Sequence, residues 1–236
     1  MARGSVNGRR SLGGYEAGAR NARGQAGAGV EAAAEAEMAE RVPGYGIGVN
    51  GPTTLGRAEG VAEGTPGELD ARLFANGGAE ATDAAIKLAR VVTGRPAVIA
   101  FKGSFHGRTM GAISITASNS FYRKGIEPLM GGVYFAPYPS KDLCPAGYDA
   151  KERAEWCLGE IRRLFKYCVA PDQVACIYVE PVQGEGGYVV PDPGFLQGLR
   201  KICTEYGIML TFDEIQSGYG RTGKMFASEH SGVVPD

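Results

Sequence analysis

Several features that would assign a function most directly are scarce in this sequence. The 236 residues include two histidines, which is too few for a histidine-rich metal site, and we expect no metal. The net charge of −1 gives no reason to expect nucleic acid as a partner. No apolar run approaches the length needed to cross a membrane. The five cysteines are scattered and include no C-x-x-C pair, which is typical of a reduced compartment such as the cytoplasm.

Residues 1–50 differ in composition from the rest of the chain. They are rich in glycine, arginine and alanine and poor in large apolar residues, so we expect a poorly ordered segment. Their arginine-rich, acid-poor beginning is also a property of mitochondrial presequences, which is an alternative interpretation. The best helix candidate here is Val30–Val42, which ends at Pro43-Gly44. We expect a separate domain over residues 51–236.

Residues 51–236 alternate between short apolar runs and longer helical patterns. The runs that predict strands are Arg72–Ala75, Ala97–Phe101, Gly132–Ala136, Val174–Val179 and Ile208–Phe212. The helical patterns cover Ala79–Val92, a segment from Asp149 to about Tyr167, and a segment from Asp192 to Tyr206. Strands that alternate with helices of this length indicate an α/β fold with a mainly parallel sheet.

The last predicted strand ends on two adjacent carboxylates, Asp213 and Glu214, at the edge where open α/β sheets bind ligands. A lone pair of acids is usually a solvated turn. The glycine-rich stretch Gly218–Lys224 then spells both G-x-G-x-x-G and G-x-x-x-x-G-K. Met225 stands where a phosphate loop has serine or threonine, and residues 213–217 separate the glycines from the strand. These two departures make a nucleotide-binding α/β protein that uses Gly218–Gly223 the less favoured alternative.

Four segments together resemble the class III pyridoxal-phosphate (PLP) aminotransferases. They are Asn76–Arg90 (NGGAEATDAAIKLAR), Gly103–Thr109 (GSFHGRT), Glu180–Gly187 (EPVQGEGG) and Phe212–Gly223 (FDEIQSGYGRTG), in the family's order. The resemblance extends from about residue 55 to the end of the chain. It implies the large domain of the fold type I PLP transferases, a homodimer, and transfer of an amino group to a 2-oxo acid. 4-Aminobutyrate, acetylornithine or a related ω-amino acid is the implied donor, and an aminomutase or racemase is a neighbouring possibility.

The resemblance assigns the cofactor's ring to residues near Asp213. The Asp213 carboxylate is expected to pair with the protonated pyridine nitrogen, which makes the ring an electron sink, and this is the catalytic residue named here. Phe105 and Ile215 are expected to cover the two faces of the ring. His106 follows Phe105 and is counted with the cofactor residues, and Gln216 is expected to reach the phenolic oxygen.

The same resemblance assigns the phosphate and the substrate side. Gly78 and Ala79 begin a predicted helix, where free N–H groups bind anions, although Gly77 replaces the family's usual serine. Glu180 and Glu185 are expected in the substrate half of the site, where one of them can pair with an arginine. Solvated loop acids are the alternative, and they suit Glu185 better than Glu180, which follows a strand.

The family's Schiff-base lysine lies roughly 30 residues after the pyridinium aspartate, on a loop that would follow Asp236. Lys102 and Lys224 do not match it. We therefore expect the first part of an aminotransferase, truncated before the small C-terminal domain, whose isolated chain has no transaminase activity. A non-catalytic fragment or pseudoenzyme that keeps the fold is the alternative.

Overall fold

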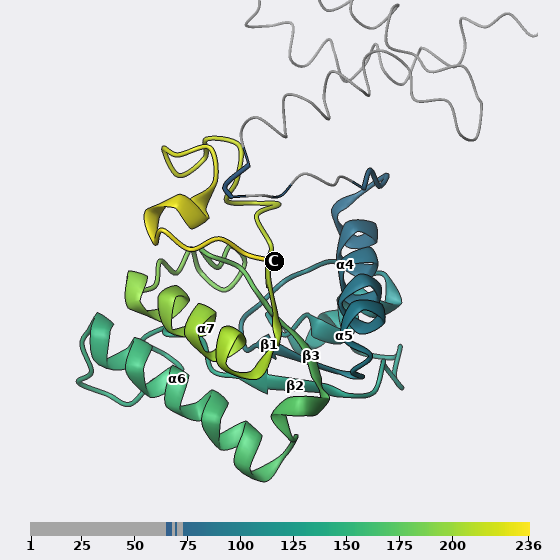
Figure 1. The fold of residues 1–236 in the computed structure, drawn as a ribbon, viewed down its shortest axis with the longest axis horizontal. Helices are drawn as coiled ribbons and strands as arrows, with labels where there is room; N and C mark the ends of the chain where they lie inside the picture. The colour runs from purple at the N-terminus through teal and green to yellow at the C-terminus, as the bar shows by residue number, and fades with distance from the viewer. Residues whose placement is uncertain (1–64, 68, 70–72) are drawn as a thin grey trace, which may run out of the picture. The chain divides into compact units, whose positions relative to one another are not determined.

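The computed structural model describes residues 65–67, 69 and 73–236 (Figure 1). The chain divides into two units, Met1–Gly60 and Val61–Asp236, and all described residues belong to the second. The predicted helix Val30–Val42 and the expected boundary at residue 50 lie outside the described residues. Within the described part, no helix has the length and apolar character that a membrane span requires.

Four parallel strands form the sheet at the centre of this unit. They are β1 (Ala97–Phe101), β2 (Val133–Ala136), β3 (Val174–Val179) and β4 (Met209–Phe212). Their order in the sheet is β2-β1-β3-β4, and each neighbouring pair is parallel. The structure therefore confirms the predicted parallel sheet and places every described strand within two residues of its predicted bounds.

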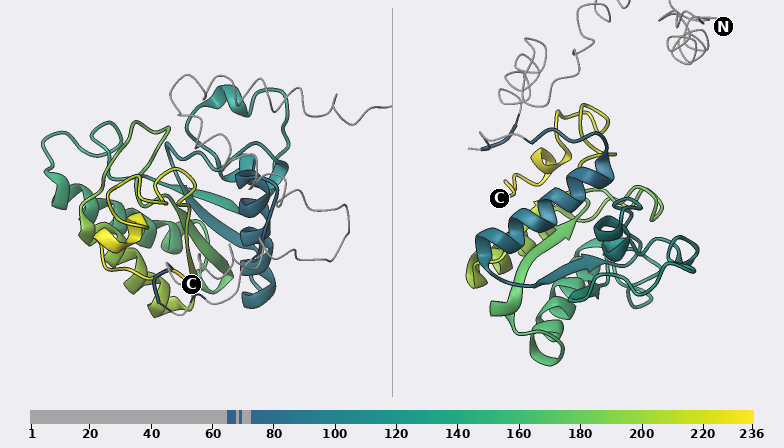
Figure 2. Two further views of the ribbon diagram at one scale, coloured as in Figure 1. Left: turned by 90° about the horizontal axis from the view of Figure 1, so that it is seen from above. Right: turned by 90° about the vertical axis from the view of Figure 1, so that its right-hand side faces the viewer.

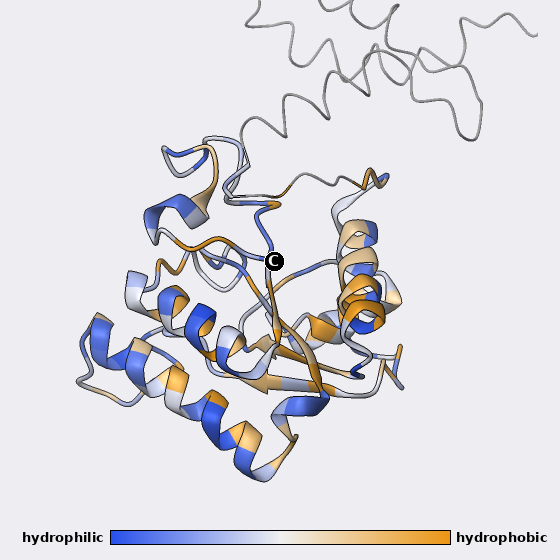
Figure 3. Ribbon diagram, viewed as in Figure 1, coloured by the Kyte–Doolittle hydropathy of each residue, from blue (hydrophilic) through white to orange (hydrophobic). Residues whose placement is uncertain are grey.

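Helices cover both faces of the sheet (Figures 1 and 2). One face carries α4 (Gly78–Thr93) and α5 (Met110–Ile115), and the other carries α6 (Ala150–Tyr167) and α7 (Pro193–Tyr206). Because side chains alternate along a strand, β1 fills two separate cores. Val98 packs with residues of α4 and α5, whereas Ile99 packs with residues of α6 and α7. Around α6 and α7 the colour alternates between hydrophilic and hydrophobic, as expected for helices with one solvated side (Figure 3).

Local sequence signals set the ends of these helices. Asp149 accepts a hydrogen bond from the Glu152 N–H, and the Glu152 carboxylate accepts one from the Asp149 N–H, both at 2.8 Å. This capping box begins α6 as predicted. Asp192 caps α7, with proline at its first position. Gly94 and Gly207 end α4 and α7 in the left-handed conformation that glycine adopts without strain.

One expected strand is absent, and one helix was not predicted. Of the predicted strand Arg72–Ala75, Arg72 lies outside the described residues and the other three form no strand. Leu73 is 75% exposed and Phe74 is 55% exposed, and no described strand pairs with their backbone. Helix α5 was not predicted, since six residues following a glycine-containing loop carry too little periodicity to show in sequence.

Candidate active site

The strand order creates a topological switch point, the place where open α/β sheets bind ligands. From β1 the chain moves to β2 on one side, and β3 and β4 then follow on the other side. The loops after β1 and β3 therefore leave the sheet in different directions, which makes their carboxyl ends a topological switch point. Phe105 and His106 follow β1, Glu180 follows β3 and Asp213 follows β4. The sequence thus delivers four of the predicted site residues to one edge of the sheet.

Asp213 and His106 form a buried pair at this edge. The His106 Nδ1 lies 2.7 Å from the Asp213 Oδ2, and the two side chains are 0% and 4% exposed. The second carboxylate oxygen, Oδ1, accepts a hydrogen bond of 3.1 Å from the Ile215 N–H. A buried carboxylate needs such partners, since desolvation without them is costly. His106 is therefore buried, and its grouping with Asp213 among the cofactor residues agrees with the geometry.

Three residues that sequence reasoning missed hold His106 in place. Its backbone N–H donates to the Thr116 Oγ1 at 2.9 Å, and its carbonyl accepts from the Thr82 Oγ1 at 3.0 Å. The Tyr178 ring meets the imidazole edge-on at 4.7 Å, and its hydroxyl donates to the Thr82 Oγ1 at 3.2 Å. The His106 Nε2 is buried without a hydrogen-bond partner among the described residues. No short sequence motif predicts these contacts, because they join residues from four different segments of the chain.

Glu180 ties the β1 loop to the β3 loop. Its Oε1 accepts from the Phe105 N–H at 3.0 Å, and its Oε2 accepts from the Gly184 N–H at 2.9 Å. Burial raises the pKa of Glu180, although the hydrogen bond from Gly184 and the nearby His106 act in the opposite direction. Glu180 is thus a buried positioning residue for the segment that carries Phe105. The described contacts do not assign it to a substrate.

Glu214 points into a different part of the structure from its neighbour Asp213. Its carboxylate accepts hydrogen bonds from the N–H groups of Ala227 (2.6 Å) and Ser228 (2.9 Å) at the start of the 3₁₀ helix Ala227–His230. The adjacent acids therefore divide into a site residue and a structural cap. The reading of both as solvated turn residues was wrong.

The start of α4 lies beside Ile215. Gly77 is the N-cap, and Gly78 and Ala79 are the first helical residues, so their N–H groups have no intrahelical acceptor. The described residues provide no other acceptor for them. A Cβ on Gly78 would lie 2.8 Å from the Ile215 Cδ1, so the absence of a side chain allows Ile215 to approach. The predicted anion-binding helix start and the predicted apolar ring contact are therefore neighbours.

The remaining predicted residues lie at the surface around this edge. Ile215 is 55% exposed, and the exposed Gln216 lies 3.5 Å from the Tyr188 hydroxyl through its amide nitrogen. Glu185 is exposed and accepts a hydrogen bond from Tyr122, which raises the pKa of that phenol. The Tyr122 ring in turn packs edge-on against Phe105 at 5.3 Å. Glu185 is therefore connected to Phe105 through Tyr122.

The glycine-rich stretch Gly218–Gly223 does not have the context of a nucleotide loop. It forms turns after Asp213 and is followed by the four-residue 3₁₀ helix η3 (Ala227–His230). A dinucleotide fingerprint runs directly from a strand into an α-helix, whose N-terminus holds the phosphates. No α-helix follows this loop within the described residues, so the geometry does not support the nucleotide-binding alternative.

Comparison with known proteins identifies the family. The family model described as "Aminotransferase class-III" matches residues 5–236. This chain is a class III aminotransferase family member. The probable 4-aminobutyrate aminotransferase of Bacillus subtilis (strain 168) is 40% identical over 195 residues, which cover 82% of this chain and 44% of that protein. The alanine/serine racemase of Pyrococcus horikoshii is 39% identical over 184 residues, or 76% of this chain and 39% of that protein.

A solved structure shows the same fold. The PLP-bound amine transaminase from an uncultivated Pseudomonas species matches with a TM-score of 0.79 and 29% identity, over 90% of this chain and 49% of that one. The match confirms the fold of the PLP transferases for this class III chain. The chain spans about two-fifths of the length of the two curated relatives.

Class III aminotransferases depend on PLP, and the residues at this edge of the sheet fit that cofactor. The buried Asp213 carboxylate supplies an anion near the switch point of the sheet, and its two hydrogen bonds leave lone pairs free. Ile215 and Phe105 supply apolar surface, and the N–H groups at the start of α4 supply phosphate donors. The charge and polarity of the described residues therefore match a flat cationic ring with a phosphate at one end.

Proposed function

We propose that the protein that contains this chain transfers amino groups with PLP, from an ω-amino acid to a 2-oxo acid. The observation that carries the proposal is the Asp213–His106 pair of 2.7 Å at the switch point of the sheet. PLP, when bound, supplies an electron sink for the carbanion formed from the amino acid. The proposal concerns the whole protein, because this chain spans only about two-fifths of the length of the two curated relatives.

In this function the residues of the chain have separate tasks. Asp213 would hold a proton on the pyridine nitrogen, and His106 keeps the carboxylate oriented through its contact with Oδ2. Phe105 and Ile215 would exclude water from the two faces of the ring. The N–H groups of Gly78 and Ala79 would bind the phosphate, and Gln216 would donate to the phenolic oxygen.

Amino-group transfer and racemisation both begin with removal of a proton from the amino acid. The relationship to an alanine/serine racemase therefore supports a second candidate, an amino-acid racemase. The complete protein separates the two readily. A transaminase consumes 2-oxoglutarate in proportion to 4-aminobutyrate, whereas a racemase inverts L-alanine or L-serine with no oxo acid present. Inversion without oxo acid would overturn the proposed transfer reaction.

Cofactor binding can be tested on the chain itself. 4′-Deoxypyridoxine 5′-phosphate keeps the ring and phosphate but has no aldehyde, so surface lysines cannot capture it. We expect Asp213→Asn to weaken its binding by about 10–100-fold, because a hydrogen bond to a charged group contributes about 1.5–3 kcal/mol. Equilibrium dialysis measures the two dissociation constants.

A matched aspartate provides the control for this experiment. Asp192 caps α7, and asparagine is an equally good N-cap, so Asp192→Asn should leave both folding and ligand affinity unchanged. Equal affinity for the wild type and Asp213→Asn would contradict the proposed role of Asp213. Equal losses in both variants would show a general effect of charge rather than a contact.

We also propose that the complete protein is a homodimer in which α4 contributes to the interface. The helix presents Leu88, Val91 and Val92 to solvent, with exposed fractions of 61%, 81% and 61%. An apolar stripe of this kind is typical of interaction surfaces. Leu88→Asp should shift the complete protein toward the monomer in sedimentation experiments, whereas Lys151→Asp on α6 should not. An unchanged dimer in Leu88→Asp would exclude this face.

A further inference from the structure

Two buried cysteines that the proposed reaction does not use lie in contact. The Sγ atoms of Cys144 and Cys157 are 3.5 Å apart. Cys157 is fully buried on α6, and Cys144 is 9% exposed on the irregular segment that follows β2. Among the described residues this is the one pair of sulfur atoms in contact, since Cys168, Cys176 and Cys203 have no sulfur partner within hydrogen-bonding distance. We propose that Cys144 and Cys157 form an intramolecular disulfide when the protein meets a peroxide.

The positions of the two residues allow the bond to form. A disulfide requires an S–S distance of about 2.05 Å, so the sulfur atoms must approach each other by about 1.5 Å. Cys157 is fixed in a long helix, but Cys144 lies in the connection between β2 and α6 and has only turn structure around it. The connection can therefore supply the movement without displacing a strand or a helix.

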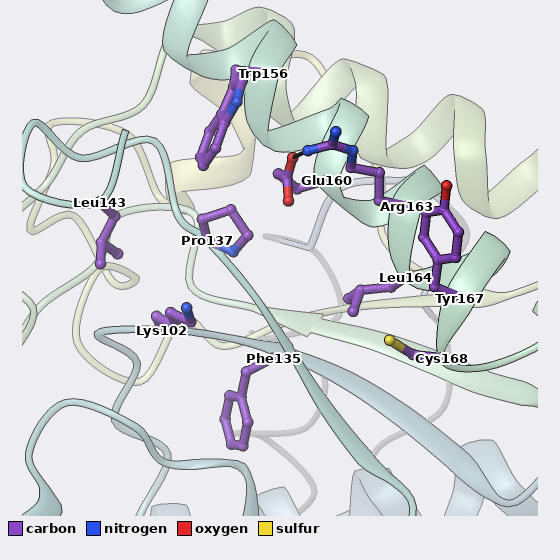
Figure 4. A pocket seen from close by; sticks show the side chains of 10 residues that line it. All are labelled: Lys102, Phe135, Pro137, Leu143, Trp156, Glu160, Arg163, Leu164, Tyr167 and Cys168. Atoms are coloured by element: carbon purple, nitrogen blue, oxygen red, sulfur yellow. Dashed lines mark hydrogen bonds and ion pairs between the residues drawn. The ribbon is translucent and has the colours of Figure 1, made fainter. Parts of the chain in front are cut away.

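A cavity lies next to the segments that carry the pair; its lining includes the exposed Cys168 but neither Cys144 nor Cys157. It measures about 400 Å³ and lies between α6 and the ends of β1 and β2 (Figure 4). Leu143 and Trp156, the residues immediately before the two cysteines, both line it. None of the predicted cofactor residues lines this cavity, so it is separate from the candidate active site. Hydrogen peroxide is small enough to enter it.

The chemistry is balanced with hydrogen peroxide as the oxidant. The Cys144 thiol loses its proton, the thiolate attacks one peroxide oxygen, and the O–O bond breaks; the departing hydroxide takes up that proton, so a sulfenic acid and one water form. The Cys157 thiol likewise loses its proton, its thiolate attacks the sulfenic sulfur, and the S–O bond breaks; the departing hydroxide takes up the proton and leaves as a second water. Two thiols and one peroxide thus give one disulfide and two waters, and the two electrons pass from sulfur to oxygen.

Burial sets the rate of this reaction. It raises the pKa of Cys144 and, more strongly, that of Cys157. Because the thiolate is the reactive form, only a small fraction of either cysteine reacts at neutral pH. The rate should therefore rise about tenfold for each pH unit below these pKa values. The rate of an ordinary surface thiol stops rising at about pH 8.5, whereas the rate of this pair should continue to rise at higher pH.

The pair is also connected to the loop that holds Glu180. The Cys144 Sγ donates to the Tyr138 carbonyl at 3.8 Å. The Tyr138 hydroxyl contacts the carbonyls of Glu180 (3.1 Å) and Pro181 (3.2 Å). Tyr138 thus connects Cys144 to Glu180, the residue that orients the segment carrying Phe105.

Peptide mapping tests the inference directly. The folded chain is treated with hydrogen peroxide, quenched with catalase, alkylated in denaturant and digested with trypsin without reductant. We expect peptide Asp142–Lys151 to appear linked to Ala154–Arg162, with the loss of two hydrogens and reversal by dithiothreitol. Full alkylation of both cysteines after oxidation of Cys168 would overturn the proposal.

Matched variants separate the pair from the other buried thiols. Cys157→Ala should abolish the linked peptide and leave Cys144 as a sulfenic acid that dimedone traps. Cys203→Ala removes another fully buried thiol and should leave the linkage unchanged. If either variant fails to fold, the wild type still decides, because a link that forms only in urea would contradict a pair preformed by the fold.

Discussion

Replacement of His106 tests whether the Asp213 carboxylate depends on its buried partner. His106→Leu fills a similar volume but removes the donor, which leaves Oδ2 of a 4% exposed side chain without a hydrogen bond. His106→Asn places an uncharged amide donor close to the position of Nδ1. The comparison of these two variants therefore isolates the hydrogen bond from the loss of the ring.

The structure sets the expected magnitude. The Nδ1–Oδ2 distance of 2.7 Å is short, as is typical of hydrogen bonds to a charged group, and such bonds contribute about 1.5–3 kcal/mol. We expect the free energy of unfolding of His106→Leu to lie below that of His106→Asn by this amount. For a domain of this size the difference corresponds to roughly 3–12 °C in Tm.

Urea unfolding followed by circular dichroism measures both free energies, and equal m-values would show that the unfolded states are comparable. The same two variants in the Asp213→Asn background complete a double-mutant cycle. There the difference should fall below about 1 kcal/mol, because a neutral amide buried without a donor costs less than a carboxylate. Equal stability of the Leu and Asn variants beside an intact Asp213 would refute the reasoning.

Three further predictions concern stability and activity. Burial raises the pKa of Glu180 above its ordinary value of 4.5, so its contribution to stability is present below about pH 4.5 and is lost as the pH rises through the folded-state pKa. The free energy of unfolding of the wild type relative to Glu180→Gln should therefore fall as the pH is raised from 4 in chemical denaturation. A Cβ on Gly198 would overlap the Leu158 Cδ1, so Gly198→Ala should cost about 1–3 kcal/mol in the same assay, and Leu158→Ala should relieve part of that cost in the double variant. We predict that residues 1–236 alone form no glutamate from 4-aminobutyrate and 2-oxoglutarate, because neither Lys102 nor Lys224 matches the Schiff-base lysine that the resemblance implies; measurable turnover would contradict this prediction.

The elements that sequence predicted well are those whose ends carry their own chemistry. Helix α6 begins at a reciprocal capping box, and α7 begins at an aspartate followed by proline. The fully buried strands β1 and β3 are continuous apolar runs, as strands of a parallel sheet covered on both faces must be. Each of these signals is local, so no knowledge of the partner element is needed to read it.

Local sequence signals also explain the wrong predictions, because they carry no information about the neighbouring element. Leu73–Ala75 has the composition of a strand, but a strand exists only where a neighbour accepts its hydrogen bonds, and no described strand does so. Strand β4 reads as buried, yet Met209, Thr211 and Phe212 are half-buried because β4 lies at the edge of the described sheet. Composition indicates that a segment is able to form a strand, whereas its actual pairing and burial depend on the elements beside it.

The site shows this limit most clearly at His106. The sequence offers a histidine between an aromatic residue and a glycine, which is most often a surface position. Its burial follows from the switch point between β1 and β3, which brings the β1 loop over Tyr178 and toward the end of β4. Asp213 could be found from sequence because a charge at the end of an apolar strand is conspicuous by itself. The partner of that charge is 107 residues away, so only the strand order, and not any motif, determines that the two meet.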